Sequence, residues 1–182
     1  MAVQSALTGH LVLSTLHTND APGAVARLLE LGVPAYLLNA TLNGVMAQRL
    51  VRTLCPHCKQ KVEFNRAEDH AGWDALVAPW KSNRPRQVYR PVGCLDCRMT
   101  GYMGRVGIYE TLVFSSAIKA LVAEKADLAA LREQAFKEGM KPLRISGAMK
   151  VGAGFTTVDE ILKVAPPVRD AFAPPVRDPD TH

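Results

Sequence analysis

Four cysteines are the residues whose types and spacing most clearly point to chemistry. Cys55 and Cys58 form one Cys-x-x-Cys pair, Cys94 and Cys97 form a second, and together they use every cysteine of the 182-residue chain. A gap of two residues lets one tight turn offer two sulfurs to a single ion, and four thiolates are a common ligand set for structural Zn²⁺. The two pairs therefore predict a closed zinc site with no ligand position left for water. Buried free thiols without a metal are the alternative.

Two histidines flank a short apolar run, residues 11–16. His10 precedes this run and His17 follows it. An apolar run of this length suits a strand buried on both faces of a parallel sheet. Ligands of α/β proteins bind at the carboxyl edge of such a sheet, so His17 is predicted to face a ligand. The alternative is that both histidines only satisfy backbone groups at the strand ends.

The following residues predict two helices. Asn19 or Asp20 can cap a first helix that has Pro22 in its first turn and stops at Gly32. Residues 33–54 carry apolar side chains at spacings of three and four, which predicts a longer second helix. Strand, helix and helix would form one α/β unit that positions the histidines.

Two strands and several helices are expected in the rest of the chain. Residues 88–93 predict a strand that approaches the second cysteine pair, and alternating apolar residues within 101–114 predict another. A capping box from Thr157 to Glu160 opens a last short helix. Further helices are expected over residues 69–78, 116–124, 127–138 and a segment through Met149.

Composition and charge narrow the class of protein. The chain is 48% hydrophobic and 21% charged, as soluble globular proteins are. It has no apolar window of about 18 residues and no signal peptide at its start, so we expect a cytoplasmic protein without a transmembrane segment. The net charge of +5 fits an anionic partner. A zinc-ribbon nucleic-acid binder is nevertheless disfavoured, because only 6% of the residues are aromatic and no dense Lys/Arg stripe is present.

The last residues have a different character. The sequence APPVRD occurs at residues 165–170 and again at 173–178, a repeat of period eight with paired prolines. The apolar pattern that builds a core stops here. Residues 165–182 are therefore predicted to form a disordered tail, with a proline-rich docking peptide as the alternative.

Three stretches resemble one known family. They read AVQSALTGHLVLSTLHTNDAPGAVARLLELGV at residues 2–33, AQRLVRTLCPHCK at 47–59 and GCLDCRMTGYMGRVGIYETL at 93–112. Over residues 2–165 the chain resembles the carboxyl-terminal half of the secretion ATPases, the hexameric motors of type II secretion and type IV pilus assembly. The two cysteine pairs match the zinc-binding insert of the secretion and pilus-extension branch.

This resemblance implies roles for four further residues. His10 and His17 match the family's histidine box, whose second histidine is directed toward the terminal phosphate of the nucleotide. An imidazole in that position can donate a hydrogen bond to a phosphate oxygen. Thr18 continues the same loop and Arg49 falls within a family motif, so both are expected to contribute to cofactor binding.

The chain also departs from the family pattern. The phosphate-binding loop G-x-x-x-x-G-K-[ST] is absent from its 182 residues, and the acidic segments that place magnesium lie upstream in the family. That loop supplies the amides and the lysine that hold the β- and γ-phosphates. ATP and magnesium are therefore expected only in the intact family architecture, and the chain alone is not expected to hydrolyse ATP.

The expected fold class is α/β. A partial RecA-like parallel sheet flanked by helices is expected over residues 1–54, a four-cysteine zinc-binding subdomain over 55–113, a helical carboxyl-terminal end over 114–164 and the Pro-rich tail over 165–182.

The expected function is that of a carboxyl-terminal fragment of an ATP-hydrolysing motor subunit of type II secretion or type IV pilus assembly. Its expected partners are the other subunits of a homo-hexamer and the platform proteins of the inner membrane, to which it would be peripheral. A stand-alone zinc-containing interaction module without ATPase activity is the alternative.

Overall fold

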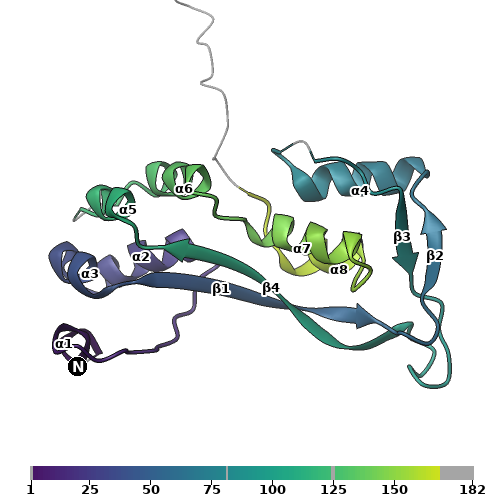
Figure 1. The fold of residues 1–182 in the computed structure, drawn as a ribbon, viewed down its shortest axis with the longest axis horizontal. Coiled ribbons are helices and arrows are strands. Elements are labelled where there is room, and N and C mark those ends of the chain that lie inside the picture. The colour runs from purple at the N-terminus through teal and green to yellow at the C-terminus, as the bar shows by residue number, and fades with distance from the viewer. Residues whose placement is uncertain (1, 81, 124–125, 169–182) are drawn as a thin grey trace, which may run out of the picture.

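A long antiparallel ribbon organises the protein, as the computed structural model shows (Figure 1). The structure describes residues 2–80, 82–123 and 126–168. In the ribbon, β1 (Gly44–Leu54) pairs with β4 (Tyr102–Val113). A shorter antiparallel ribbon joins β2 (Gln60–Glu63) to β3 (Gln87–Arg90) at the far end of the long one.

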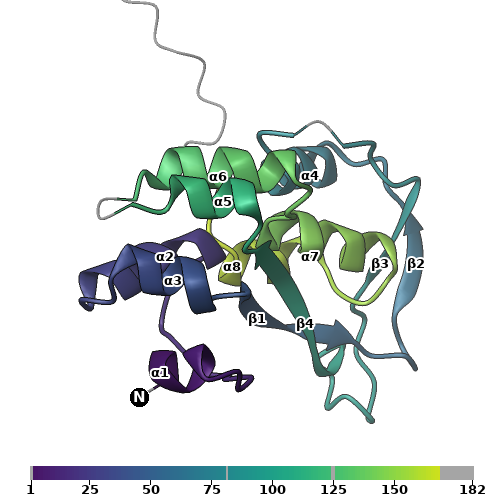
Figure 2. The ribbon, with the colours of Figure 1, turned by 60° about the vertical axis from the view of Figure 1, so that its left-hand side comes forward.

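Helices other than the first cover one face of the long ribbon, and the first helix lies apart, beside α3 (Figures 1 and 2). One group packs near the start of β1, a second pair packs over the middle of the ribbon, and α4 lies beside the short ribbon. The helices are α1 (Ala2–Leu7), α2 (Ala21–Glu30), α3 (Ala35–Thr41), α4 (Ala67–Val77), α5 (Ser116–Leu121), α6 (Leu128–Lys137), α7 (Leu143–Gly152) and α8 (Val158–Val164).

Burial alternates along the long ribbon with the period of two that strands impose. Val51, Ile108 and Leu112 lie on the face covered by helices and are at most 2% exposed. Their neighbours Leu50 and Tyr109 are on the opposite face and remain 47% and 42% exposed. The ribbon therefore has one face in the core and one open face.

The helix predicted from residue 21 is confirmed as α2. Asp20, rather than Asn19, is its N-cap, because the Oδ1 atom of Asp20 accepts a hydrogen bond of 2.8 Å from the backbone N–H of Gly23. A Cβ atom at position 23 would lie 2.5 Å from that oxygen, so a larger residue there would require the Asp20 side chain to shift. Pro22 lies in the first turn, as predicted.

The strand predicted over residues 11–16 is not formed. This segment has no regular structure, and the side chains of Leu11 and Leu13 are 81% and 88% exposed. A strand needs a neighbour for its backbone N–H and C=O groups, and β1 and β4 already pair with each other. The described residues contain no parallel strand pair, so a RecA-like sheet is not confirmed; what they form is a mixed α/β fold with two antiparallel ribbons.

The long helix predicted over residues 33–54 is also wrong in its second half. The helix ends with α3 at Thr41, and the chain then enters β1. Apolar side chains at Val45, Ala47 and Val51 fit a period of two as well as a period near 3.6, so the pattern alone was ambiguous. Pairing with β4 along nearly the whole strand decides in favour of the strand.

The later elements follow the predictions closely. The strands before and after the second cysteine pair are β3 and β4, and the expected helices are α4, α5, α6, α7 and α8. Thr157 caps α8 by accepting a hydrogen bond of 3.4 Å from the backbone N–H of Glu160. The tail prediction falls mostly on residues 169–182, which lie outside the described residues. Among the helices that the structure describes, none combines the length and the apolar character needed to cross a bilayer.

Candidate functional site

The four cysteines converge at the end of the long ribbon. The first pair directly follows β1, and the second lies between β3 and β4. Their Sγ atoms all lie within 4.8 Å of one another. The Sγ–Sγ distances are 3.9 Å for Cys55 and Cys94, 3.8 Å for Cys58 and Cys97, and 3.7 Å for Cys94 and Cys97.

This arrangement fits a tetrahedral metal ion. Four thiolates at about 2.3 Å from one Zn²⁺ would stand about 3.8 Å apart, which agrees with the three Sγ–Sγ distances. Backbone N–H groups also point at the sulfurs: Gly93 donates to Cys58 at 3.3 Å, and Gly101 donates to Cys97 at 3.2 Å. The four cysteines could therefore hold a metal ion in a closed thiolate site.

The backbone around Cys97 favours its thiolate form. Burial opposes ionisation, but hydrogen bonds from the backbone N–H groups of Cys94 and Gly101, together with those from the Cys94 and Cys58 thiols, outweigh it and lower the pKa of Cys97 to about 6. The turn that aims these amides is unusual, because Arg98 and Met99 both adopt positive φ values, 53° and 61°. Such left-handed conformations persist outside glycine only where surrounding contacts hold them.

The histidines occupy the exposed segment that precedes α2. His10 is exposed, and its Nδ1 atom lies 3.1 Å from the Oγ1 atom of Thr8. His17 is exposed as well. Among the described residues, no hydrogen bond joins either histidine to Thr18 or Arg49.

The structure brings the other two predicted residues together. The Nη2 atom of Arg49 donates hydrogen bonds of 3.3 Å to the carbonyl oxygens of Thr18 and Asn19. The hydroxyl of Thr18 donates to the carbonyl oxygen of Asp20 at 3.1 Å. Arg49 thus reaches from β1 to the backbone that directly follows His17.

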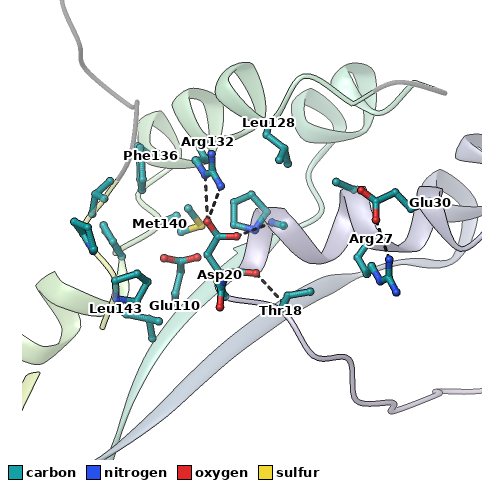
Figure 3. A pocket seen from close by; sticks show the side chains of 18 residues that line it. Thr18, Asp20, Arg27, Glu30, Glu110, Leu128, Arg132, Phe136, Met140 and Leu143 are labelled. Atoms are coloured by element: carbon teal, nitrogen blue, oxygen red, sulfur yellow. Dashed lines mark hydrogen bonds and ion pairs between the residues drawn. The ribbon is translucent and has the colours of Figure 1, made fainter. Parts of the chain in front are cut away.

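A charged group on the other side of this loop was not predicted. Figure 3 shows Asp20 between Arg132 of α6 and Glu110 of β4, at a cavity of about 450 Å³. Arg132 donates two hydrogen bonds to the Oδ2 atom of Asp20, at 3.2 and 2.8 Å. The Oε1 atom of Glu110 accepts a hydrogen bond of 2.8 Å from the backbone N–H of Ala21.

Burial of the Glu110 carboxyl raises its pKa, and the nearby charge of Asp20 adds to the effect, although the N–H of Ala21 opposes it. The side chain of Glu110 is only 5% exposed, and its neighbours on the covered face of the ribbon, Ile108 and Leu112, are apolar. A carboxyl group in such surroundings is stable only where it is hydrogen-bonded.

A second buried carboxylate ties the ribbon to α8. Arg52 donates to both carboxylate oxygens of Glu160, at 2.8 and 2.6 Å, and Lys163 donates to Oε1 at 3.0 Å. The Arg52 guanidinium also stacks over the ring of Tyr102, 4.1 Å from its centroid. Hydrogen bonding to Arg52, against the opposing effect of burial, lowers the pKa of Glu160 to about 2.

Comparison with known protein families identifies the family of the chain. The family described as Type II/IV secretion system protein matches residues 1–163. The chain belongs to this family. The matched residues contain its histidine segment, both ribbons, its cysteine cluster and its carboxyl-terminal helices, except for the last residue of α8.

Relatives within the secretion family are similar to nearly all of the chain. It is 51% identical over 166 residues to the type IV pilus assembly ATPase TfpB of Acinetobacter baylyi, 91% of this chain and 28% of that protein. It is 47% identical over 169 residues to the type IV pilus assembly ATPase PilB of Myxococcus xanthus, and the match covers 93% of this chain and 29% of that protein. Identity to the type II secretion system ATPase E of Vibrio cholerae is 42% over 164 residues, and the match covers 90% of this chain and 31% of that protein. The chain spans about three tenths of the length of these relatives.

The sequence analysis did not identify Glu110 and Arg132 as residues that contact the loop after His17. Glu110 carried a signal, because it alternates with Ile108 and Leu112 and therefore had to share their covered face once residues 101–114 formed a strand. Arg132 carried none, because an arginine on a helix usually faces solvent, and its partner Asp20 lies 112 positions away in the sequence. Only the packing of α6 against α2 brings the two together.

Proposed function

We propose that this chain forms the carboxyl-terminal part of an ATP-hydrolysing motor subunit that serves type II secretion or type IV pilus assembly. The observation that carries the proposal is the match of residues 1–163 to the secretion family, joined to 51% identity with a pilus assembly ATPase. Because the chain spans about three tenths of such relatives, the remainder of the motor would supply the other catalytic groups.

The histidine segment would complete the nucleotide pocket in the intact motor. Residues 11–16 would then form a strand of a RecA-like parallel sheet, and the high exposure of Leu11 and Leu13 supports this, because such apolar side chains favour burial. His17 would donate a hydrogen bond to the terminal phosphate, with His10 at the other end of the strand. Thr18 and Arg49 would line the same loop.

The cysteine cluster would bind a structural zinc ion. The Sγ–Sγ distances of 3.7 to 3.9 Å support zinc, and four thiolates leave no open position for chemistry. Cys55, Cys58, Cys94 and Cys97 would hold together the unit of residues 55–113. Residues 1–54 would belong to the nucleotide-binding unit and residues 114–164 to a helical end.

ATP and magnesium would bind only in the intact motor. A Gly-Lys-Ser/Thr phosphate loop does not occur in the 182 residues, so the chain by itself would be inactive. The motor would be a homo-hexamer in the cytoplasm, peripheral to the inner membrane through platform proteins. No nucleic-acid partner is proposed.

A chimaera tests this proposal. The part of the chain that matches Acinetobacter baylyi TfpB, 166 residues long, replaces the corresponding part of TfpB. ATP hydrolysis is measured for this chimaera and for the isolated chain. We expect hydrolysis by the chimaera and none by the chain. His17→Ala should lower kcat of the chimaera about a hundredfold or more, whereas the matched change His57→Ala, at another exposed histidine, should leave kcat unchanged.

Two results would contradict the proposal in different ways. An unchanged kcat in His17→Ala would remove His17 from the nucleotide pocket. A chimaera that folds, binds zinc and yet hydrolyses no ATP would contradict the motor function itself. Together with a cooperative, monomeric isolated chain, that second result would favour the stand-alone zinc-containing interaction module.

A further inference from the structure

Order changes abruptly at His17. Residues 10–16, directly before it, are exposed and have no regular structure, whereas residues 18–21, here named the anchor loop, are held by side chains from three different elements. His17 is the last residue before the anchor loop. Its Cα atom is therefore one peptide unit, about 3.8 Å, from the first anchored residue.

The first contact comes from α6. Arg132 reaches Asp20 with two nitrogens, and both side chains are largely withdrawn from solvent, with exposures of 21% and 25%. A charge-assisted pair of this kind is stronger and less screened than an exposed one. Asp20 already caps α2 through Gly23, so helix capping does not require Arg132.

The second and third contacts come from the ribbon. The Glu110 carboxylate, on β4, binds the backbone N–H of Ala21, and Arg49, on β1, binds the carbonyl oxygens of Thr18 and Asn19. Burying a carboxyl group at position 110 costs free energy that an apolar side chain in the same row would avoid. The hydrogen bond from the backbone N–H of Ala21 offsets part of this cost.

We propose that Arg132, Glu110 and Arg49 are positioning residues that clamp the anchor loop and thereby set where His17 points, so that the placement of α6 and the ribbon is coupled to the nucleotide site. The proposal rests on the proposed function, because it assigns regulation to the same histidine. Figure 3 shows the geometry: Asp20 is held from the side of α6 by Arg132, with Glu110 below it on β4.

The coupling works in both directions. A shift of α6 would pull Asp20 through its two hydrogen bonds and move the backbone at His17. Conversely, a change of the His17 position on loss of its phosphate partner would strain the Asp20–Arg132 pair and displace α6. The cavity beside the pair gives the loop room for such a movement.

Hydrogen exchange on the 182-residue chain tests the clamp itself. In Arg132→Gln the backbone amides of Ala21 and Gly23 should exchange about fivefold to tenfold faster, which corresponds to the loss of about one typical hydrogen bond. The matched control is Lys137→Gln, which removes the same charge from the same helix but breaks only an exposed pair with Glu133. Its exchange at Ala21 should match that of the unchanged chain. Equal exchange in all three proteins would overturn the clamp.

A double-mutant cycle in the chimaera tests positioning. Arg132→Gln should lower kcat between about tenfold and a hundredfold while KM changes little, because a small misplacement of a reacting group has such an effect. When His17 is already alanine, Arg132→Gln should lower kcat no further. A purely structural role predicts instead that the two losses multiply, and multiplied losses would overturn the positioning role.

Further variants keep each outcome decisive. If Arg132→Gln fails to fold, as judged by zinc content and thermal unfolding, Arg132→Lys retains the charge and should show a smaller loss of the same kind. An unchanged kcat in His17→Ala with faster exchange in Arg132→Gln would remove His17 from the nucleotide pocket and leave the clamp without a catalytic role. A fall of kcat in His17→Ala alone, with Arg132→Gln as active as the unchanged chimaera, would overturn the positioning role and leave the proposed function intact.

Discussion

Two buried glutamates show how strongly single residues depend on their partners in this fold. Glu110 and Glu160 are both nearly buried, at 5% and 6% exposure. The pKa of Glu110 is raised, because burial dominates over hydrogen bonds from the neutral backbone N–H groups of Ala21 and Leu143. The pKa of Glu160 is lowered to about 2, because hydrogen bonds from the Arg52 guanidinium outweigh the cost of its burial. A charged donor at Glu160 and a larger burial cost at Glu110 together give the two shifts their opposite signs.

Glu160 should therefore make stability depend on pH in the acid range. Its pKa falls from an ordinary 4.5 to about 2 in the folded protein, so its stabilisation is present above pH 4.5 and is lost as the pH falls toward 2. Glu160→Gln should lower the free energy of unfolding at pH 7 by about 1 to 2 kcal/mol, less than the full shift implies because Arg52 is half exposed.

Urea unfolding at pH 7 and pH 3 measures this difference. The gap in unfolding free energy between the unchanged chain and Glu160→Gln should shrink at pH 3. Glu133→Gln, which removes a carboxylate from an exposed pair, serves as the control and should show little effect at either pH. A gap that stays constant between the two pH values would show that Glu160 does not titrate with the lowered pKa.

At the scale of elements, the cysteine cluster joins the two ribbons. The turn after β1 carries one pair, and the turn between β3 and β4 carries the other. The backbone N–H of Cys55 also donates to the carbonyl oxygen of Gly101 at 2.9 Å, which connects the two turns directly. A metal ion would add four bonds at this junction, where the described residues contain no helix.

Removal of the metal should destabilise this junction more than it destabilises the helices. Cys97→Ser should reduce bound zinc from one equivalent to well below one and lower the melting temperature, because the binding free energy of a structural metal contributes to folding. Amide exchange should rise in residues 93–101 more than in α2 and α6. Metal content and exchange are compared with those of His57→Ala, which keeps all four thiolates. Retention of a full equivalent of zinc in Cys97→Ser would contradict a four-cysteine site.

The elements also show what the sequence could predict. Motifs confined to a few neighbouring residues were found correctly: the paired cysteines that converge, the cap at Asp20 and the capping box at Thr157. Two predictions failed where the outcome depended on distant residues. Residues 44–54 became a strand because β4 pairs with them from about sixty positions away, and residues 11–16 did not become a strand because the described chain supplies no partner. The Asp20–Arg132 contact depends on distant packing in the same way.

At the scale of the whole molecule, large apolar side chains remain exposed on the segment before α2 and on the open face of the long ribbon, two surfaces that the proposed motor would cover. Leu11 and Leu13 are more than four-fifths exposed, and the open face of the long ribbon adds Met46, Leu50 and Val113 at 47 to 64%. Contiguous exposed apolar surface usually marks an interface. Helices pack against the other face of the same ribbon (Figure 1). The difference in exposure between the two faces therefore follows from how the helices pack on the ribbon.

This surface predicts opposite effects of one substitution in two settings. In the isolated chain, Leu13→Asp should reduce self-association, because it places a charge on an exposed apolar segment. In the chimaera with TfpB the same change should lower the yield of folded protein and its ATP hydrolysis, because the leucine would there be buried in a sheet and a buried unpaired charge is strongly destabilising.

Leu95→Asp is the matched control, because Leu95 is 90% exposed in the cysteine turn. Its change should not disturb the proposed sheet, either in the isolated chain or in the chimaera. Sedimentation velocity over a concentration series measures association of the chain, and thermal unfolding with ATPase assays measures the chimaera. If Leu13→Asp were as stable and active in the chimaera as Leu95→Asp, residues 11–16 would remain exposed in the motor, and the proposal that they form a sheet strand beside the nucleotide would fail.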